Sequence, residues 1–143
     1  MATVHSLKLA DAIALFQGVV SSGEVPADWE KERERGGFFG LGVFDQEELT
    51  GFALAESHPS LVHALCVDGT PDACRLLINK LSMMAGERNL NVWVPLARGD
   101  VIDYVKSRGF QRLCEESMRG APSRLYRLQK GPEEREDEGE EGS

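Results

Sequence analysis

Three strand-like segments in succession, followed by a long helical segment and a fourth strand-like segment, leave this chain few folds to adopt. The first three segments cover residues 38–44, 49–57 and 61–67. Short polar connections separate them, including residues 45–48, so an antiparallel meander is predicted. The fourth segment, 90–96, follows a helix, and a right-handed crossover therefore places it parallel to the third.

Helical patterns fill much of the remaining chain. Residues 8–20 place apolar side chains at spacings near three and four, which is typical of an amphipathic helix, and a short strand over 3–7 is expected before it. A strongly charged helix is predicted over 26–35. A long helix is predicted over 71–87, with Pro71 in its first turn.

The C-terminal part of the domain predicts a short helix between strands. Asp100 is expected to cap a helix over 101–108, because a carboxylate at a helix start accepts bonds from backbone N–H groups. Gly109 supplies the left-handed residue that ends this helix. Strands over 110–113 and 124–128 then complete the domain.

The negative charge of the chain is concentrated at its end. The formal net charge is -8 over 143 residues, and residues 131–143 contain seven acidic side chains against Arg135 alone. This segment has no apolar side chain to bury and its like charges repel, so a disordered acidic tail is expected. We interpret it as a solubilising tail, with an interaction motif as the alternative. Residues 1–130 are predicted to form one domain.

The charge of the body narrows the range of partners. Residues 1–130 are close to neutral and lack the basic excess that nucleic-acid binding requires, whereas a cationic or amine substrate is mildly favoured. No run approaches the roughly 18 apolar residues of a membrane helix. Residues 1–9 lack the basic and then apolar pattern of a secretory signal, so a cytoplasmic protein without a membrane partner is expected.

Cysteine and histidine spacing argues against a disulfide framework and against a metal site. Cys66, Cys74 and Cys114 are odd in number and include no Cys-x-x-Cys pair. The three histidines lie far from metal-ligand spacing. The sequence therefore predicts reduced structural thiols and no metal.

The order of these elements resembles the acyl-CoA-dependent N-acetyltransferase (GNAT) superfamily over about residues 3–130. The most specific pieces are the strand over 61–67, the helix after it, and the segment 104–110, which is similar to the family's short aromatic-rich helix closed by Gly-Phe. The resemblance implies an α/β (α+β) fold with a mixed, mostly antiparallel sheet, a splayed parallel strand pair and flanking helices. It also implies acetyl-CoA as cosubstrate and acetyl transfer to a small amine or a protein amine.

The resemblance further implies where acetyl-CoA binds. In the family, the strand corresponding to 61–67 parts from its parallel neighbour, here 91–95, and leaves a wedge in the sheet. Backbone groups at the wedge bind the pantetheine arm much as an added strand would. The positions implied for this role are Leu65, Cys66 and Val67. The following turn and helix start then hold the pyrophosphate.

At the helix start this sequence departs from the family pattern. Asp72 stands where the family has an arginine, and Ala73 and Arg75 occupy two glycine positions, with Cys74 between them. Asp72 is interpreted as an acid that stabilises the helix, because it lies near the positive end of the helix dipole. In the alternative interpretation, Arg75 supplies the missing positive charge from one turn further on.

Three residues are candidates for proton transfer. Tyr104 is adjacent to Val105, the position at which many members of the family have the tyrosine that protonates the leaving thiolate; a packing aromatic is the alternative. Glu56 and His63 are the nearest candidates for a base, with a solvent-facing glutamate and a core or groove histidine as alternatives. By the strand period of two, His63 is expected to share a face with Leu61, Leu65 and Val67.

The tryptophans and the departures from the family pattern keep several functions open. Trp93 lies mid-strand and is predicted to be core, whereas Trp29 either anchors its charged helix or stacks on an amine substrate. Asp72 and Val105 replace two of the family's working positions. A catalytically degenerate binding or regulatory module is therefore the alternative to an enzyme, and a structural protein without a CoA site is the third possibility.

Overall fold

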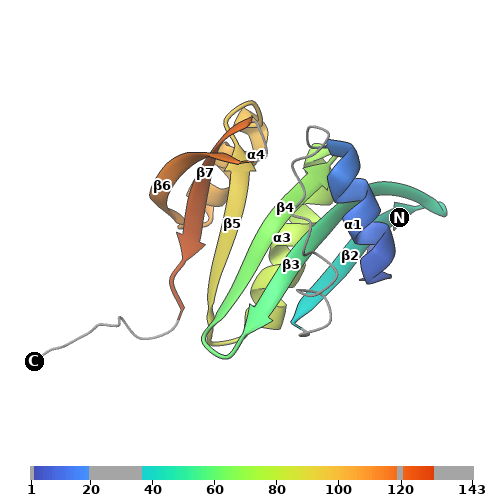
Figure 1. Ribbon diagram of the computed structural model, residues 1–143, viewed down its shortest axis with the longest axis horizontal. Coiled ribbons are helices and arrows are strands. Elements are labelled where there is room, and N and C mark those ends of the chain that lie inside the picture. The colour runs from blue at the N-terminus through green and yellow to red at the C-terminus, as the bar shows by residue number, and fades with distance from the viewer. Residues whose placement is uncertain (1, 20–36, 119–120, 131–143) are drawn as a thin grey trace, which may run out of the picture.

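The computed structural model describes residues 2–19, 37–118 and 121–130, which form a seven-stranded sheet with helices on both faces (Figure 1). The strand order is β1-β2-β3-β4-β5-β7-β6, and every neighbouring pair is antiparallel except β4 with β5. This is the mixed, mostly antiparallel sheet that the sequence predicted. The strands are β1 (Ala2–Leu7), β2 (Phe38–Asp45), β3 (Glu48–His58), β4 (Leu61–Gly69), β5 (Asn89–Pro95), β6 (Gln111–Met118) and β7 (Ala121–Leu128), and the helices in the described ranges are α1 (Leu9–Val19), α3 (Pro71–Ala85) and α4 (Gly99–Ser107).

The helices divide between the two faces of the sheet (Figure 1). α1 packs over β2 and β3, where Ala12 and Phe16 meet Phe52 and Leu54 in a small apolar cluster. α3 and α4 cover the opposite face and bury a larger core with the strands. Burial of a large apolar side chain stabilises the fold by about 1.5–3 kcal/mol relative to exposure. The largest buried side chains that α3 contributes at helical spacing are Cys74, Leu77, Ile78 and Leu81.

α3 begins where the sequence predicts. Thr70 is the N-cap, and its Oγ1 accepts a hydrogen bond of 3.1 Å from the backbone N–H of Ala73. Pro71 occupies the first turn, where a missing N–H costs no helical bond. The helix ends at Ala85, earlier than predicted, because Gly86 adopts a positive φ of 62°.

The β2–β3 hairpin is tighter than the predicted four-residue connection over 45–48. Only Gln46 and Glu47 lie between the strands, with left-handed φ values of 53° and 70°. A two-residue turn of this hand matches the right-handed twist of the strands. Asp45 and Glu48 are therefore able to pair as the last rung of the ladder.

β4 also extends further than predicted, through Asp68 and Gly69, which the sequence assigned to a loop. Gly69 has a φ of 132°, and an added Cβ would lie 2.4 Å from the Cα of Gly51 and from the carbonyl oxygen of Thr50. Only glycine satisfies both conditions. Because Gly69 can lie this close to β3, β4 stays paired with β3 up to the residue before the N-cap of α3.

The C-terminal hairpin corrects two predicted strand lengths. β6 and β7 run over 111–118 and 121–128, whereas the sequence predicted 110–113 and 124–128. Glu115, Glu116 and Ser117 lie in β6, which is the last strand of the sheet. Charged and polar side chains are usual on such an edge. They interrupt the apolar pattern from which a strand is predicted, so the sequence analysis ended this strand too early.

Some predictions lie outside the described residues. These are the charged helix over 26–35 with Trp29, and the acidic tail over 131–143. The three cysteines form no disulfide, in agreement with the prediction of reduced thiols. Of the helices in the described ranges, none has the length and apolar character required to cross a membrane.

Candidate functional site

The parallel strands β4 and β5 pair at one end and separate at the other. Their ladder runs from Leu61 opposite Asn89 to Ala64 opposite Val92 and then stops. Beyond this point β4 follows β3 and β5 follows β7, as Figure 1 shows. We call residues 61–64 and 89–92 the paired end, and residues 65–69 and 93–95 the diverged end. The splayed pair implied by the sequence resemblance is thereby confirmed.

A β-bulge at Leu65 marks the point of separation. β3 pairs Leu54 with Cys66 and Ala55 with Ala64, so Leu65 is an extra residue in β4. A bulge bends its strand and increases the local twist, which turns β4 away from β5.

The bulge also corrects the predicted faces of β4. Val67 lies in the core under α3 together with Val62 and Ala64, whereas Leu65 and Cys66 pack in the cluster under α1. His63 alternates with Val62 and Ala64, so Val67 does not share its face as the strand period predicted. One extra residue shifts the alternation from that point onward.

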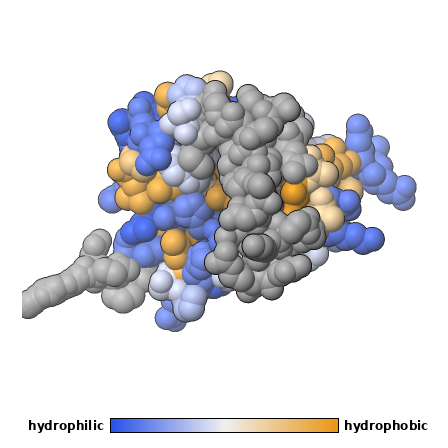
Figure 2. All heavy atoms as spheres, viewed as in Figure 1, coloured by the Kyte–Doolittle hydropathy of each residue, from blue (hydrophilic) through white to orange (hydrophobic). Residues whose placement is uncertain are grey.

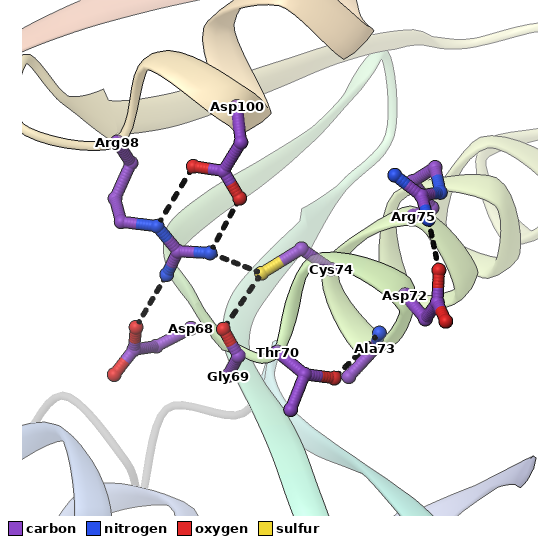
Figure 3. Close-up of polar contacts among 9 residues, drawn as sticks. All are labelled: Asp68, Gly69, Thr70, Asp72, Ala73, Cys74, Arg75, Arg98 and Asp100. Atoms are coloured by element: carbon purple, nitrogen blue, oxygen red, sulfur yellow. Dashed lines mark hydrogen bonds and ion pairs between the residues drawn. The ribbon is translucent and has the colours of Figure 1, made fainter.

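The diverged end opens at the start of α3, where the predicted pyrophosphate residues lie. The Ala73 N–H is already bound by Thr70 Oγ1, and Pro71 has no N–H, so fewer amides are available to an anion than at an uncapped helix start. The Asp72 carboxylate accepts a bond from Arg75, and Figure 3 shows both side chains on the side of α3 away from Cys74. In the alternative interpretation Arg75 supplied the positive charge for the pyrophosphate, but in the structure its charge is paired with Asp72.

Arg98 links the two sides of the diverged end (Figure 3). Its Nη1 donates to Asp68 Oδ1 at the end of β4 over 3.0 Å. Its Nε and Nη2 donate to the two oxygens of Asp100 in α4 over 3.1 and 2.9 Å. Nη2 also approaches the sulfur of Cys74 in α3 at 3.7 Å. One guanidinium thus connects β4, α3 and α4.

The prediction that Asp100 caps α4 is wrong. α4 begins at Gly99, its N-cap position is Arg98, and no side chain caps it. The carboxylate of Asp100 instead binds the guanidinium of Arg98 in a two-bond pair. These hydrogen bonds lower the pKa of Asp100 and raise that of Arg98.

Neither cysteine at the diverged end is suited to act as a nucleophile. Burial, with the nearby charge of Asp68 as a smaller cause, raises the pKa of the Cys66 thiol to about 12. Burial also raises the pKa of Cys74, although Arg98 opposes the shift. Both groups therefore remain thiols near neutral pH, and reactivity requires the thiolate.

The two predicted bases lie side by side at the paired end. Glu56 of β3 is the direct cross-strand partner of His63 in β4. The indole N–H of Trp93 donates to His63 Nε2 over 3.0 Å. Burial lowers the pKa of His63, with Glu56 acting in the opposite direction, so the ring is neutral and carries its proton on Nδ1. Its acceptor nitrogen is thus already used. The Glu56 carboxylate has Oε2 3.5 Å from His58 Nε2 and keeps its second oxygen as an acceptor.

The same row of the sheet continues into residues that the sequence analysis missed. Asn91 lies opposite His63 on β5, and Arg127 lies opposite Asn91 on β7. Arg127 Nε donates to Asn91 Oδ1 over 2.8 Å. No local sequence pattern singles out either residue, and only the register across four strands brings them together.

In the same view as Figure 1, Figure 2 shows hydrophilic residues among small hydrophobic patches on the described surface over β5–β7.

Tyr104 does not lie near the cross-strand neighbours of His63. Its hydroxyl donates to Asn79 of α3 over 2.7 Å and accepts a bond from Arg108, whose guanidinium lies over the ring. The neighbouring Val105 is completely buried in the core under α3 and α4. Tyr104 therefore fills the position between α3 and α4, on the face of the sheet opposite to α1.

Solved structures similar to this one include acetyltransferases. A probable acetyltransferase from Staphylococcus epidermidis superposes with a TM-score of 0.65 at 14% identity, covering 90% of this chain and 98% of that one. The ribosomal-protein-S18-alanine N-acetyltransferase from Escherichia coli gives 0.64 at 14% identity, covering 96% and 99%. Arabidopsis thaliana NAA60 in complex with acetyl-CoA gives 0.60 at 16% identity, covering 90% and 98%. No protein-family model matches the chain, and no curated protein matches it by sequence.

Proposed function

Because the chain has the fold of the GNAT acetyltransferases, we propose that it binds acetyl-CoA at the diverged end of β4 and β5 and transfers the acetyl group to an amine. The observation that carries this proposal is the end of the β4–β5 ladder at Ala64 and Val92, next to the bulge at Leu65. A neighbour with the same fold was solved in complex with acetyl-CoA. We further propose that residues 1–130 form the transferase domain in the cytoplasm.

The diverged end fits an extended pantetheine arm. Over residues 65–67, β4 has no partner strand on its β5 side among the residues described. Amide groups of a pantetheine chain pair with such an edge as an added strand does. In this proposal Leu65, Cys66 and Val67 hold the arm through their backbone, so their side chains remain free to pack under the helices.

The start of α3 fits a pyrophosphate less well. Asp72, Ala73, Cys74 and Arg75 lie there as the resemblance implied, and the helix dipole favours an anion. The Asp72 carboxylate opposes it and neutralises Arg75. Charge at this end therefore has to be rearranged before a phosphate is stabilised.

For acetyl transfer, a bound acetyl-CoA supplies the thioester. The amine must lose its proton before or as it attacks, and we assign this step to Glu56, whose side chain is 25% exposed. A carboxylate at this position also attracts a cationic amine. His63 acts as a positioning residue, because its acceptor nitrogen is bound by Trp93. Tyr104 could protonate the leaving thiolate only after its hydroxyl leaves Asn79.

A catalytically inactive binding module is the second candidate function. The observation that favours it is the burial of Val105 at the family's tyrosine position, together with the binding of the Tyr104 hydroxyl by α3. This candidate shares the acetyl-CoA site and differs only in the absence of turnover.

Titration of the protein with acetyl-CoA, followed by calorimetry and amide NMR, tests both candidates. We expect the largest amide shifts in residues 65–77 and 91–95, and acetylated product with at least one member of an amine panel. Binding without product over the panel would select the inactive module. An absence of binding at millimolar acetyl-CoA would reject both candidates.

A further inference from the structure

We propose that Arg98 is the phosphate-binding cation of this chain and that Asp68 competes with the cofactor for it. This inference rests on the proposed function and assigns a residue that the sequence pattern did not indicate. It explains how a chain with Asp72 at the family's arginine position could still bind an anion.

The geometry around Arg98 divides its partners into two kinds. Asp100 holds Nε and Nη2 with two parallel bonds and fixes the plane of the guanidinium. Asp68 accepts a single bond from Nη1. Because a guanidinium has five N–H groups, the second N–H of Nη1 has no partner within the described part of the chain. The Nη1 edge is thus the exchangeable side of Arg98.

Arg98 also contacts both elements that border the predicted pyrophosphate position. Its bond to Asp68 meets the last residues of β4, and its contact with Cys74 meets the first turn of α3. These are the two elements that converge at the predicted pyrophosphate position. The Arg98 side chain is 23% exposed, so its charge is partly sheltered from water and still accessible to a ligand.

The Asp68 bond is weak enough to be replaced. The side chains of Asp68 and Asp100 are equally exposed, at 39%, so the number of bonds distinguishes them: Asp68 accepts only one, and exposed single ion pairs contribute little to stability. A pyrophosphate carries more charge than a carboxylate and offers several oxygens to the same N–H groups. Exchange of Asp68 for phosphate therefore strengthens the interactions of Arg98 while Asp100 keeps it oriented.

The net charge around Arg98 explains why Asp68 has to be displaced before an anion binds. Asp68, Asp72 and Asp100 face two cations, Arg98 and Arg75, so the described side chains at this end carry a net charge of about -1. Arg75 is occupied by Asp72 on the other side of α3 (Figure 3). Arg98 is consequently the cation whose release makes the end attractive to an anion.

The test compares acetyl-CoA with acetyl-pantetheine, which has the arm and the thioester but no phosphate. Arg98→Gln should weaken acetyl-CoA binding by about tenfold or more and leave acetyl-pantetheine binding within about twofold of wild type. Asp68→Asn should tighten acetyl-CoA binding by about threefold or more, because it removes the competitor. Arg75→Gln and the exposed Lys106→Gln are the charge-matched controls, and both should have smaller effects than Arg98→Gln.

A double variant separates competition from general electrostatics. In the Arg98→Gln background, Asp68→Asn should lose most of its effect on acetyl-CoA affinity. If Asp68→Asn instead changes acetyl-CoA affinity equally in wild type and in Arg98→Gln, Asp68 acts only through its charge. That result would overturn the proposed competition for Arg98. Thermal unfolding of each variant confirms that the fold is kept, and Arg98→Lys, which keeps the charge without the two-bond pair, should show an intermediate affinity.

The two proposals fail in different ways. If wild type binds acetyl-CoA and Arg98→Gln binds it equally well, or if Arg75→Gln has the larger effect, the assignment of Arg98 is wrong while the proposed function stands. If wild type does not bind acetyl-CoA at millimolar concentration, the proposed function fails and this inference fails with it. Tighter binding of acetyl-CoA by Asp68→Asn than by wild type would support the competition directly.

Discussion

Two arginines lie at opposite ends of the β4–β5 pair and bind different kinds of partner. Arg88, next to the paired end, donates to the carbonyl oxygens of Ala85, Met84 and His58 and to the hydroxyl of Ser57. Arg98, at the diverged end, donates to two carboxylates and approaches a thiol. The backbone carbonyls are fixed by the helix and the turn to which they belong, whereas the Asp68 carboxylate, which accepts a single bond from Arg98, can exchange.

The comparison indicates a division of labour along one strand pair. At the paired end, Arg88 joins the β3–β4 turn to the end of α3, and the ladder keeps Glu56 and His63 in register. At the diverged end, the strands are held by their outer neighbours and by a rearrangeable ion cluster. The end with fixed bonds suits positioning of reacting groups, and the end with exchangeable bonds suits ligand entry.

The sharpest test of this division is Glu56→Gln. The change removes the proposed base and keeps the shape of the side chain, so we expect turnover to fall by about 100-fold, with acetyl-CoA affinity unchanged. Steady-state kinetics with an accepted amine and calorimetry with acetyl-CoA measure the two quantities. Glu48→Gln, at the exposed start of β3, is the matched control and should behave as wild type. Unchanged turnover in Glu56→Gln would show that Glu56 is not the base.

Stability should distinguish the two arginines directly. Arg88→Ala deletes hydrogen bonds from a charged donor to three backbone carbonyls, so we expect it to lower the free energy of unfolding by about 2 kcal/mol. Arg98→Gln removes only partly exposed ion pairs and should cost less than about 1 kcal/mol. Urea denaturation of both variants gives the two values. A larger loss in Arg98→Gln would contradict the view that its cluster is exchangeable.

Much of the fold could be predicted from the sequence because its signals are local. The meander, the start of α3 at Pro71 and the end of the short helix before Gly109 all follow from apolar runs and from proline and glycine. The bulge at Leu65 could not be predicted, since nothing in Leu-Cys-Val distinguishes an inserted residue from a regular one. That single residue reversed the predicted face of Val67.

The candidate site was predicted less completely because its residues meet through pairing across the sheet. Glu56 and His63 were identified separately, and only the register makes them neighbours. Asn91 and Arg127 carry no local signal at all. For Asp100, the sequence rule for helix caps failed because α4 begins at Gly99, which places Asp100 inside the first turn, where its carboxylate binds Arg98.

The pH dependence of stability should report on His63 at the paired end. Burial lowers its pKa in the folded state, so the unfolded chain binds the proton more readily as pH falls below about 6.5. The stability linked to His63 is therefore complete above that value and is lost as pH falls toward the folded pKa. Urea midpoints at pH 7.5 and 5.5 should differ less in His63→Gln than in wild type. A difference in His63→Gln as large as in wild type would contradict this assignment.

The smallest expected effect is that of Tyr104→Phe on turnover. Because the hydroxyl donates to Asn79 and lies between α3 and α4, its removal should cost about 1 kcal/mol of stability and change turnover by less than about twofold. Tyr126→Phe is a matched control, since its hydroxyl also accepts from a neighbouring arginine and its ring is buried. A tenfold loss of turnover in Tyr104→Phe alone would mean that α4 turns during catalysis and brings this hydroxyl to the diverged end. The hydrogen bond between Tyr104 and Asn79 would then itself be exchangeable. Exchangeable bonds would not be confined to the ion cluster around Arg98, and the contrast between the two ends of the strand pair would fail.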